Sequence, residues 1–210
     1  METIHLELVR QGAAEIGLRL DAEQVRLLGR HVDLLLKWNK SINLTAITAP
    51  AEVVEKHLLD SLALAPLVPG GSLLDAGSGA GFPGIPLAIA RPNLEVVLVD
   101  SVQKKVAFLK NALAELRLPN VRAIATRLEG NPSREELPRV HSAVSRALAA
   151  PEEWLKLAVE YVLPGGLAFC MMGPAETIPE RVGDLVLQRE LKYQLPFSKA
   201  DRRLAIYKHV

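Results

Sequence analysis

The first third of the chain has the spacing of apolar side chains that is typical of amphipathic helices. Between residues 24 and 38 the apolar positions recur every three or four residues and form one stripe: Val25, Leu28, Val32, Leu35 and Trp38. A second helical pattern opens at Pro50 and stops before the proline and glycine cluster at residues 66–71. Because this cluster is the clearest internal boundary, we expect residues 1–66 to form a helical extension packed on a domain of residues 67–210.

Beyond this cluster, short apolar runs alternate with amphipathic stretches. Strands are expected in SLLDAG (72–77), LEVVLVD (94–100), VRAIAT (121–126), HSAVSRA (141–147) and LAFCMM (167–172). Helices are expected over 83–90, 102–116 and 151–163, the last stopped by the PGG at 164–166, and part of 174–190 is also expected to be helical. LKYQLPF (191–197) and RRLAIYKHV (202–210) resemble two final strands. The alternation predicts an α/β fold with a doubly wound, mostly parallel sheet and an antiparallel C-terminal hairpin.

The composition is that of a globular protein. Of the 210 residues, 49% are hydrophobic and 23% are charged, and the net charge of +1 does not point to a polyanionic partner. Basic residues gather locally, with nine Lys/Arg against four Asp/Glu over residues 101–150. The single cysteine, Cys170, favours a reducing compartment. The N-terminal METIHLELVRQ has acids where a signal peptide needs bases, and no apolar run reaches 18 residues, so we expect a cytoplasmic protein without a membrane segment.

The stretch LLDAGSGAGFPG, residues 73–84, is the strongest candidate for a ligand site. It reads as a strand that runs into a glycine turn, and Gly79–Gly84 has the G-x-G-x-x-G spacing of a dinucleotide-binding turn. In a doubly wound sheet this turn lies where ligands bind. Glycine-rich turns are common, however, so the spacing alone does not identify the ligand.

Two neighbouring features favour S-adenosylmethionine over NAD, and a third suits either cofactor. Asp75 would crowd a pyrophosphate but suits the ammonium group of an amino acid. Pro83 and Pro86 remove backbone donors that a phosphate would use. Asp100 ends the next strand, where an acid can accept both ribose hydroxyls. A cation with a ribose and an amino-acid tail fits both acids, although Asp75 could simply form the turn and Asp100 could cap the following helix.

The chain also resembles a known family. LLLKWNKSINLTAIT, KHLLDSLALAP, LLDAGSGAGFPGIPLAIARP, VDSVQKKVAFL and AVSRALA occur in this order in the bacterial 16S ribosomal RNA guanine-N7 methyltransferase G family, also called the glucose-inhibited division protein B family. The resemblance is strong over residues 30–173 and follows the pattern only at the two ends. It implies a Rossmann-like class I methyltransferase fold that carries an N-terminal helical extension.

The resemblance also implies an activity and partners. The expected reaction transfers the methyl group of S-adenosylmethionine to N7 of a guanine in 16S ribosomal RNA of the small subunit, namely guanine 527 of the decoding-region hairpin. By position, Gly77, Gly79 and Phe82 would line the cofactor, Asp100 would hold its ribose, and Leu128 and Glu129 would flank its adenine. We expect a monomer. The five histidines and one cysteine lack metal-ligand spacing, so no metal is expected.

The substrate side of the predicted site is less well defined. Arg146, in the SRA motif, is the candidate catalytic residue, since it would lie between cofactor and substrate and could orient the guanine through O6. Its alternative role is an ion pair at the end of a strand. No general base is needed, because N7 carries no proton, and positioning can supply up to about 7–11 kcal/mol of the barrier. Two positions depart from the family pattern: His141 replaces an expected acid, and Met172 replaces an expected lysine.

Candidate RNA-binding residues lie in the N-terminal extension. Lys37, Asn39 and Lys40 surround the end of the first helical pattern, where lysines could reach phosphate. His57 is a further candidate, although His57, Asp60 and Ser61 on one helix turn are more simply explained by structural hydrogen bonds than by a hydrolase triad. Two alternatives to the RNA methyltransferase stay open: an NAD(P)-dependent oxidoreductase and a cofactor-binding module without catalysis.

Overall fold

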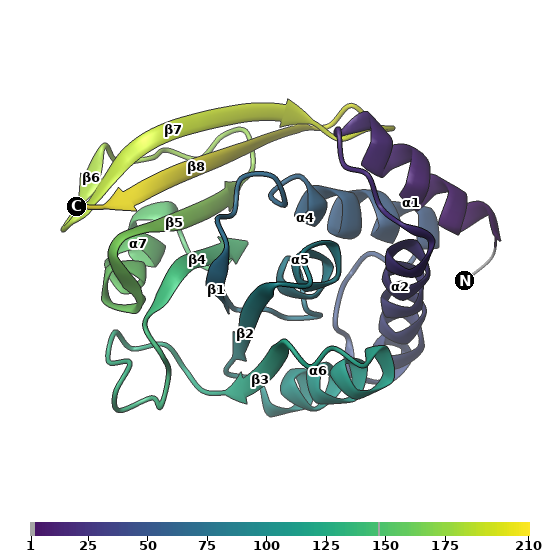
Figure 1. Cartoon of the computed structure of the whole chain (residues 1–210), viewed down its shortest axis with the longest axis horizontal. Helices are drawn as coiled ribbons and strands as arrows, with labels where there is room; N and C mark the ends of the chain where they lie inside the picture. The colour runs from purple at the N-terminus through teal and green to yellow at the C-terminus, as the bar shows by residue number, and fades with distance from the viewer. Residues whose placement is uncertain (1–2, 147) are drawn as a thin grey trace.

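The computed structural model describes residues 3–146 and 148–210. Their strands form one eight-stranded sheet (Figure 1). The strands are β1 (Gly71–Ala76), β2 (Leu94–Asp100), β3 (Val121–Ala125), β4 (Val140–Arg146), β5 (Val162–Met172), β6 (Arg181–Val182), β7 (Leu185–Gln194) and β8 (Asp201–His209). Their order is β3-β2-β1-β4-β5-β8-β7-β6. Neighbours from β3 to β5 are parallel, and β8, β7 and β6 pair antiparallel. The predicted mostly parallel sheet with an antiparallel C-terminal hairpin is confirmed.

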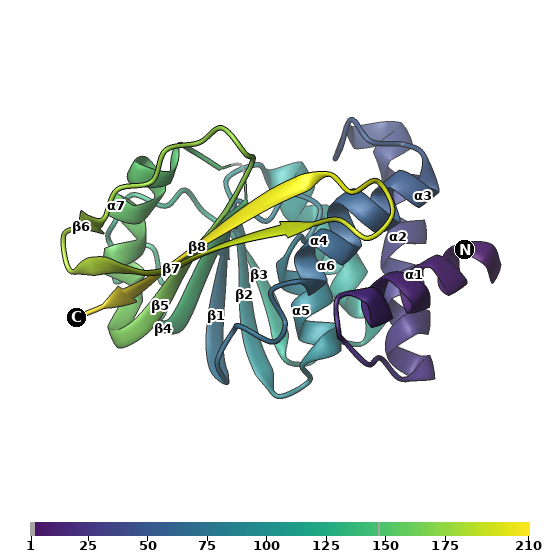
Figure 2. The ribbon, with the colours of Figure 1, turned by 90° about the horizontal axis from the view of Figure 1, so that it is seen from above.

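Helices cover both faces of the sheet (Figure 2). They are α1 (Thr3–Glu15), α2 (Ala22–Ile42), α3 (Pro50–Val53), the π-helix η1 (Val54–Leu59), α4 (Asp60–Leu62), α5 (Gly84–Ala90), α6 (Gln103–Leu116) and α7 (Pro151–Tyr161). Successive strand residues point to opposite faces, so Leu73 packs with the N-terminal helices, α5 and α6, whereas Leu74 packs with α7. Within the described residues, none of the helices combines the length and the apolar composition that a membrane crossing requires.

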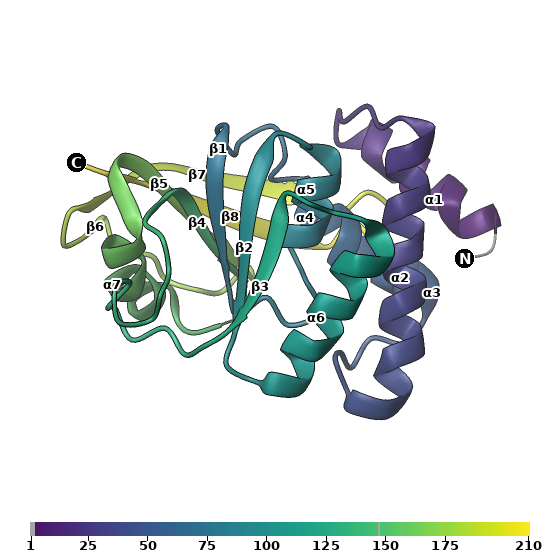
Figure 3. The same cartoon turned by 60° about the horizontal axis from the view of Figure 1, so that its bottom comes forward.

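The N-terminal helices are packed into the same core as α5 and α6. α2 begins with a capping box between Asp21 and Gln24 and ends at Asn43, whose φ of +50° is left-handed. The Gln24 side chain also donates to the carbonyls of Ile89 and Ala90 at the end of α5. α2 runs beside α6 (Figure 3), and most of the predicted apolar stripe is fully buried, with Trp38 half-buried against the ring edge of Phe108.

Two expectations about the C-terminal third are wrong. Residues 174–190 contain no helix; they form β6 and most of β7 instead. The PGG at 164–166 does not lie between a helix and a strand, because β5 already begins at Val162 and runs through it. The sequence VLQRELK at 186–192 is made largely of good helix formers, but pairing with β8 along the full length of β7 overrides that local preference.

The tip of the β7–β8 hairpin is tied to the N-terminal helices. The buried carboxylate of Glu55, in η1, accepts hydrogen bonds from the backbone N–H groups of Phe197 (2.9 Å) and Ser198 (2.5 Å). The hairpin therefore spans from the sheet to the helices, as Figures 1 and 2 show. This crossing places side chains of β7 and β8 beside the end of β4.

Candidate active site

Two adjoining clefts open at the carboxyl ends of the parallel strands, where doubly wound sheets bind their ligands. The Asp100 cleft, of about 520 Å³, is lined by the ends of β2 and β3, the segment after β4 and α7. The Phe82 cleft, of about 530 Å³, is lined by the glycine turn, the loop after α2, η1 and the β7–β8 hairpin. Gly77 and Lys105 line both clefts. Ligands bound in the two clefts would therefore meet at these two residues.

The glycine turn between the clefts depends on residues without a side chain. Gly77 and Gly79 have φ values of +69° and +57°, in the left-handed region that favours glycine. The N–H of Gly77 donates to the carbonyl of Val99 (2.8 Å), which fixes the turn to the end of β2. At Gly84 a Cβ atom would collide with the side chains of Leu98 and Asp75. The backbone can thus approach a ligand closely at Gly77 and Gly79, and Gly84 allows α5 to pack on β1 and β2.

Asp75 lies beneath the glycine turn. It is fully buried at the end of β1, where Oδ2 accepts from the N–H of Gly84 (2.8 Å), while Oδ1 has no hydrogen-bond partner among the described residues. Burial raises the pKa of this carboxyl to about 7, against the opposing effect of the Gly84 hydrogen bond. Asp75 is not among the residues that line either cleft. Its predicted contact with an ammonium group remains a prediction, one that the free Oδ1 atom supports.

Asp100 does line its cleft, and backbone donors fix its orientation. Oδ2 accepts from the N–H of Gly79 (3.0 Å) and Oδ1 accepts from the N–H of Val102 (2.9 Å). The ammonium of Lys105 lies 3.7 Å from Oδ2. The alternative of a helix cap is partly realised, because Asp100 binds Val102, the residue that precedes α6. The carboxylate is nevertheless held at the cleft wall, as a ribose-binding acid should be.

The two residues predicted to flank an adenine are placed differently. Leu128 lines the Asp100 cleft, together with Leu148 and Leu157 from the opposite side, so the cleft offers apolar surface to a flat ring. Glu129 is exposed and is not among the lining residues described for either cleft. Its backbone N–H donates to the carboxylate of Glu135 (3.0 Å). The structure thus brings Leu128, but not the Glu129 side chain, to the site.

Phe82 is a nearly buried ring around which other planar groups gather. The imidazole rings of His31 and His57 stack on it, with centroid distances of 4.7 and 5.2 Å. The guanidinium carbon of Arg146 lies 5.4 Å from the ring centroid, within the range of a cation–π contact. His31 is fully buried and donates from Nε2 to the carbonyl of Ala80 (2.8 Å), so it is a packing residue.

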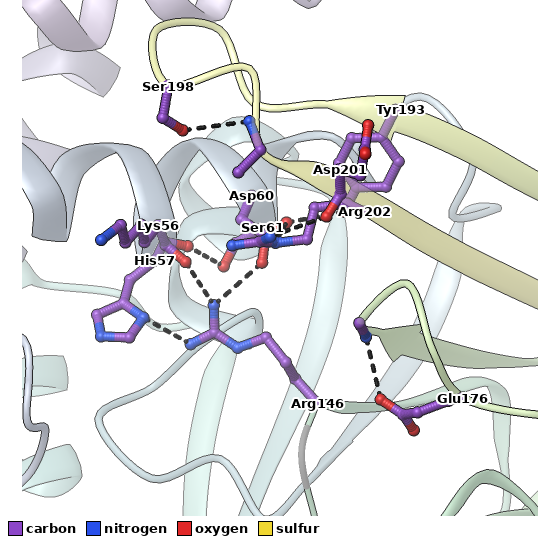
Figure 4. Close-up of polar contacts among 12 residues, drawn as sticks. Lys56, His57, Asp60, Ser61, Arg146, Glu176, Tyr193, Ser198, Asp201 and Arg202 are labelled. Carbon is purple, nitrogen blue, oxygen red and sulfur yellow. Dashed lines mark hydrogen bonds and ion pairs between the residues drawn. The ribbon is translucent and has the colours of Figure 1, made fainter.

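Arg146, at the end of β4, projects into the Phe82 cleft and contacts η1 and α4 (Figure 4). One terminal nitrogen donates to the carbonyl of Lys56 (3.3 Å) and to Oδ2 of Asp60 (3.5 Å), and the other donates to Nδ1 of His57 (3.2 Å). The bonds to Lys56 and Asp60 are longer than the usual 2.7–3.2 Å, whereas the bond to His57 lies at the upper end of that range. The guanidinium is therefore present at the cleft with its direction set.

The contacts of His57 define its charge and tautomer. A guanidinium can only donate, so Nδ1 of His57 must be the acceptor for Arg146 and carries no proton. Nε2 then carries the proton and faces the hydroxyl of Thr45 (2.8 Å). Burial, followed by the charge of Arg146, lowers the pKa of His57 to about 3. Ser61 donates to the carbonyl of His57 (2.5 Å), which confirms a structural role for that hydroxyl.

The predicted RNA-binding residues of the N-terminal helices divide into two groups. Lys37 and Lys40 are exposed on α2, free to meet a partner. Asn39 instead stabilises the following loop. Its side-chain amide donates to the carbonyl of Thr45 and accepts from the backbone N–H of Thr45, both at 2.9 Å. Asn39 thereby places Thr45 against His57. Its predicted contact with RNA stays a prediction beside this structural role.

Several residues at the Phe82 cleft carry no signal in the sequence. Tyr193 and Arg202 come from the β7–β8 hairpin and line the cleft, although nothing in the local pattern links them to the glycine turn. Lys105 could have been found, since it lies in the first turn of the helix that follows Asp100. Of the two departures from the family pattern, Met172 lines the Phe82 cleft, whereas His141 lies at the start of β4 and accepts a hydrogen bond from the N–H of Ser72 (3.1 Å).

Comparison with known proteins gives a consistent result. The model of the family described as rRNA small subunit methyltransferase G matches residues 24–205. Curated relatives named "Ribosomal RNA small subunit methyltransferase G" include one from Anaeromyxobacter sp. (strain Fw109-5), 49% identical over 98% of both chains. Another, from Myxococcus xanthus (strain DK1622), is 47% identical over 93% of both chains.

Solved structures of lower sequence identity share the fold. TrmN from Thermus thermophilus matches with a TM-score of 0.53 at 19% identity, over 71% of this chain and 47% of that one. A predicted O-methyltransferase from Agrobacterium tumefaciens matches with a TM-score of 0.55 at 19% identity, over 73% of this chain and 79% of that one. The predicted class I methyltransferase fold and the predicted enzyme class are confirmed. The chain belongs to the rRNA small subunit methyltransferase G family.

Proposed function

We propose that this protein transfers the methyl group of S-adenosylmethionine to N7 of a guanine in 16S ribosomal RNA. The observation that carries the proposal is the meeting of the two clefts at Gly77 and Lys105, with Arg146 projecting into the acceptor side. A methyl group that leaves one cleft can be received in the other without crossing solvent. Family membership supports the RNA substrate, and guanine 527 of the decoding-region hairpin is the position that the resemblance implies.

The residues of the Asp100 cleft fit S-adenosylmethionine. Asp100 would accept from the ribose hydroxyls, Leu128 would contact the adenine, and the turn at Gly77 and Gly79 would lie along the methionine part. Oδ1 of Asp75 has no partner among the described residues and could receive the ammonium group if the glycine turn moved, because the atom is buried and Asp75 lines neither cleft. When bound, the cofactor supplies an electrophilic methyl group on a sulfonium. An acid beneath the turn and two proline residues near it suit this cation better than they suit a pyrophosphate.

The residues of the Phe82 cleft orient the acceptor rather than activate it. N7 of guanine is a lone-pair acceptor without a proton, so no base has to remove one. Arg146 presents two donor edges, which suit the neighbouring O6 atom, and its position over Phe82 limits the directions it can take. Neutral His57 accepts a hydrogen bond from the second terminal nitrogen of Arg146 and adds no positive charge to the cleft. Catalysis then comes from positioning and electrostatic complementarity.

A transfer assay tests the proposal. Tritiated S-adenosylmethionine is incubated with the protein and either isolated small subunits or stripped 16S RNA, and the product is mapped by cleavage at 7-methylguanosine. We expect label in the RNA, at one guanine. Arg146→Ala should lower the rate by about 10²–10³-fold, as loss of a preorganised donor does elsewhere. Arg122→Ala, which changes an exposed arginine on β3, is the control.

Three results would contradict the proposal. Label found only in a small molecule would remove RNA as the substrate. Binding of S-adenosylmethionine without any transfer to either RNA substrate would favour a cofactor-binding module. Calorimetry that detects NAD but not S-adenosylmethionine would favour an oxidoreductase. The comparison between small subunits and stripped RNA also shows which form of the substrate the protein recognises.

A further inference from the structure

Asp60 is a buried carboxylate at the Phe82 cleft to which the proposed reaction gives no task. Its side chain is 6% exposed, and donors from three separate parts of the chain surround it (Figure 4). Oδ1 accepts from the hydroxyl of Tyr193 (2.8 Å) and lies 3.5 Å from Nε of Arg202. Oδ2 lies 3.5 Å from Arg146. Asp60 therefore connects α4, the end of β4 and the C-terminal hairpin.

The charge of Asp60 matters because the two arginines beside it would otherwise repel each other. A carboxylate taken out of water is costly unless cations and hydrogen bonds compensate it, and here Arg146, Arg202 and Tyr193 offset part of that cost, while burial still raises the pKa of Asp60. Without Asp60, the partners left to Arg146 are the Lys56 carbonyl and His57, which are both neutral. The guanidinium would then lose the only carboxylate that holds it among the described residues.

Tyr193 decides which oxygen of Asp60 faces Arg146. Its hydroxyl engages Oδ1 at the short distance of 2.8 Å, so Oδ2 is the atom turned toward the arginine. Tyr193 is itself held by the hairpin, whose tip is fixed through Glu55 at the other end of the same helical segment. The hairpin position is thus transmitted through Tyr193 and Asp60 to Arg146.

We infer that Asp60 is the positioning residue of Arg146, and that Tyr193 holds Asp60 in the orientation that Arg146 needs. The inference rests on the proposed function, since it assigns these residues to the acceptor side of the same reaction. Neither residue lines the Asp100 cleft as described. Their loss should therefore slow methyl transfer and leave the binding of S-adenosylmethionine unchanged.

The first test removes one hydroxyl. Tyr193→Phe keeps the ring and should lower kcat by about 3- to 10-fold, the value of one hydrogen bond to a charged group. The dissociation constant for S-adenosylmethionine should stay within about twofold. Tyr207→Phe is the matched control, because Tyr207 is a buried tyrosine of β8 whose hydroxyl donates to the Pro179 carbonyl instead. The two variants should lose similar thermal stability, and only Tyr193→Phe should lose turnover.

The second test asks whether Asp60 acts through Arg146. Asp60→Asn, an isosteric change, should lower kcat by about 10- to 100-fold in the otherwise unchanged protein. In a protein that already carries Arg146→Ala, the same change should have almost no further effect on the slow residual transfer, because the group it positions is gone. Long incubations with tritiated cofactor make that residual rate measurable.

The outcomes separate this inference from the proposed function. If the unchanged protein transfers no methyl group to RNA, the proposed function fails before any variant is compared. If it does transfer, equal turnover of Tyr193→Phe and Tyr207→Phe overturns the inference. An Asp60→Asn effect of the same size in the unchanged protein and in the Arg146→Ala protein also overturns the inference. A parallel loss of S-adenosylmethionine binding and melting temperature in both Asp60→Asn and Tyr193→Phe would show a structural role and overturn it as well.

Discussion

The Asp100 cleft takes its glycine turn, its carboxylate and its lysine from one stretch of chain, residues 77–105, whereas six polar side chains of the Phe82 cleft come from four distant stretches. Thr45 lies in the loop after α2, His57 and Asp60 in the helical segment that follows, Arg146 at the end of β4, and Tyr193 with Arg202 in the hairpin. The donor side is therefore a property of local backbone conformation. The acceptor side is a property of tertiary packing.

Substitutions on the donor side and on the acceptor side should therefore have different effects. Damage to the glycine turn disturbs the packing of α5 on β1 and β2, so stability and cofactor binding should fall together. Damage among the acceptor side chains removes polar contacts at a cleft wall, so turnover should fall while stability and cofactor binding hold. The comparison can be tested with one variant on each side.

Among the substitutions that compare the two clefts, the largest effect is expected from Arg146→Lys. Lysine keeps the positive charge but offers one compact ammonium in place of a planar fork, and it cannot reach the Lys56 carbonyl, Asp60 and His57 from two edges at once. We expect the rate of methyl transfer to fall by about 100-fold, with S-adenosylmethionine affinity unchanged by calorimetry. A lysine variant with full activity would show that charge alone, and not the shape of the donor, serves the acceptor side.

Gly84→Ala should damage the donor side through packing. The added Cβ would collide with the buried side chains of Leu98 and Asp75, which costs about 1–3 kcal/mol of unfolding free energy in an already filled core. Because Asp75 must move, S-adenosylmethionine binding should weaken in parallel. Urea unfolding and calorimetry measure the two effects. Gly70→Ala is the control, since a Cβ there meets nothing within 4 Å; equal behaviour of the two variants would rule out the proposed collision.

Asp75→Asn should change how stability depends on pH. Burial raises the folded pKa of Asp75 to about 7 from an ordinary value of 3.8, so the folded protein keeps a proton that the unfolded chain releases. Unfolding free energy should therefore fall as pH rises from about 4 to about 7 and level off above it. Asparagine cannot lose a proton, so the variant should lack this decline, a difference on the order of 2–4 kcal/mol at pH 8.

Unfolding in urea across this pH range, with Glu95→Gln at an exposed position of β2 as control, gives the comparison. The same variant tests the ammonium contact: S-adenosylmethionine should bind more weakly once the carboxylate is neutral. Unchanged affinity would show that Asp75 serves only to pack the turn. A wild-type protein whose stability rises between pH 4 and 7, with the control rising equally, would contradict the buried acid.

The sequence was informative where function follows from local conformation. The strand before Gly77, the turn and the acid at Asp100 are visible as a pattern, because positive φ values and a strand-ending acid need particular residue types at fixed spacing. The fold class, a doubly wound sheet, was predictable because strands and helices alternate along the chain. α2 and the helical segment from Pro50 could be recognised from apolar spacing, whereas the ends of α2 at Asp21 and Asn43 were not predicted.

The hairpin shows what the sequence could not provide. β7 contains helix-forming residues, and only its pairing with β8 makes it a strand. Tyr193 reaches Asp60 across 133 positions of sequence because the hairpin tip is tied to Glu55, and no spacing rule encodes such a contact. The π-helix η1 also left no signal in the sequence, although it places His57 and the Lys56 carbonyl beside Arg146. The sequence thus indicated Arg146 and His57 individually, but neither Tyr193 and Arg202 nor the network that joins these residues.

The smallest effect is expected from the protonation of His57. Burial, the charge of Arg146 and the nearby His31 keep its pKa at about 3, well below the usual 6.5. His57 should thus stay neutral between pH 5 and 8, with Nδ1 accepting from Arg146 throughout. The imidazole signals of His57 in NMR should not shift across this range. An inflection near pH 6 in the His57 signal would mean that Arg146 does not hold this ring, and the acceptor side would then be less ordered than its contacts indicate.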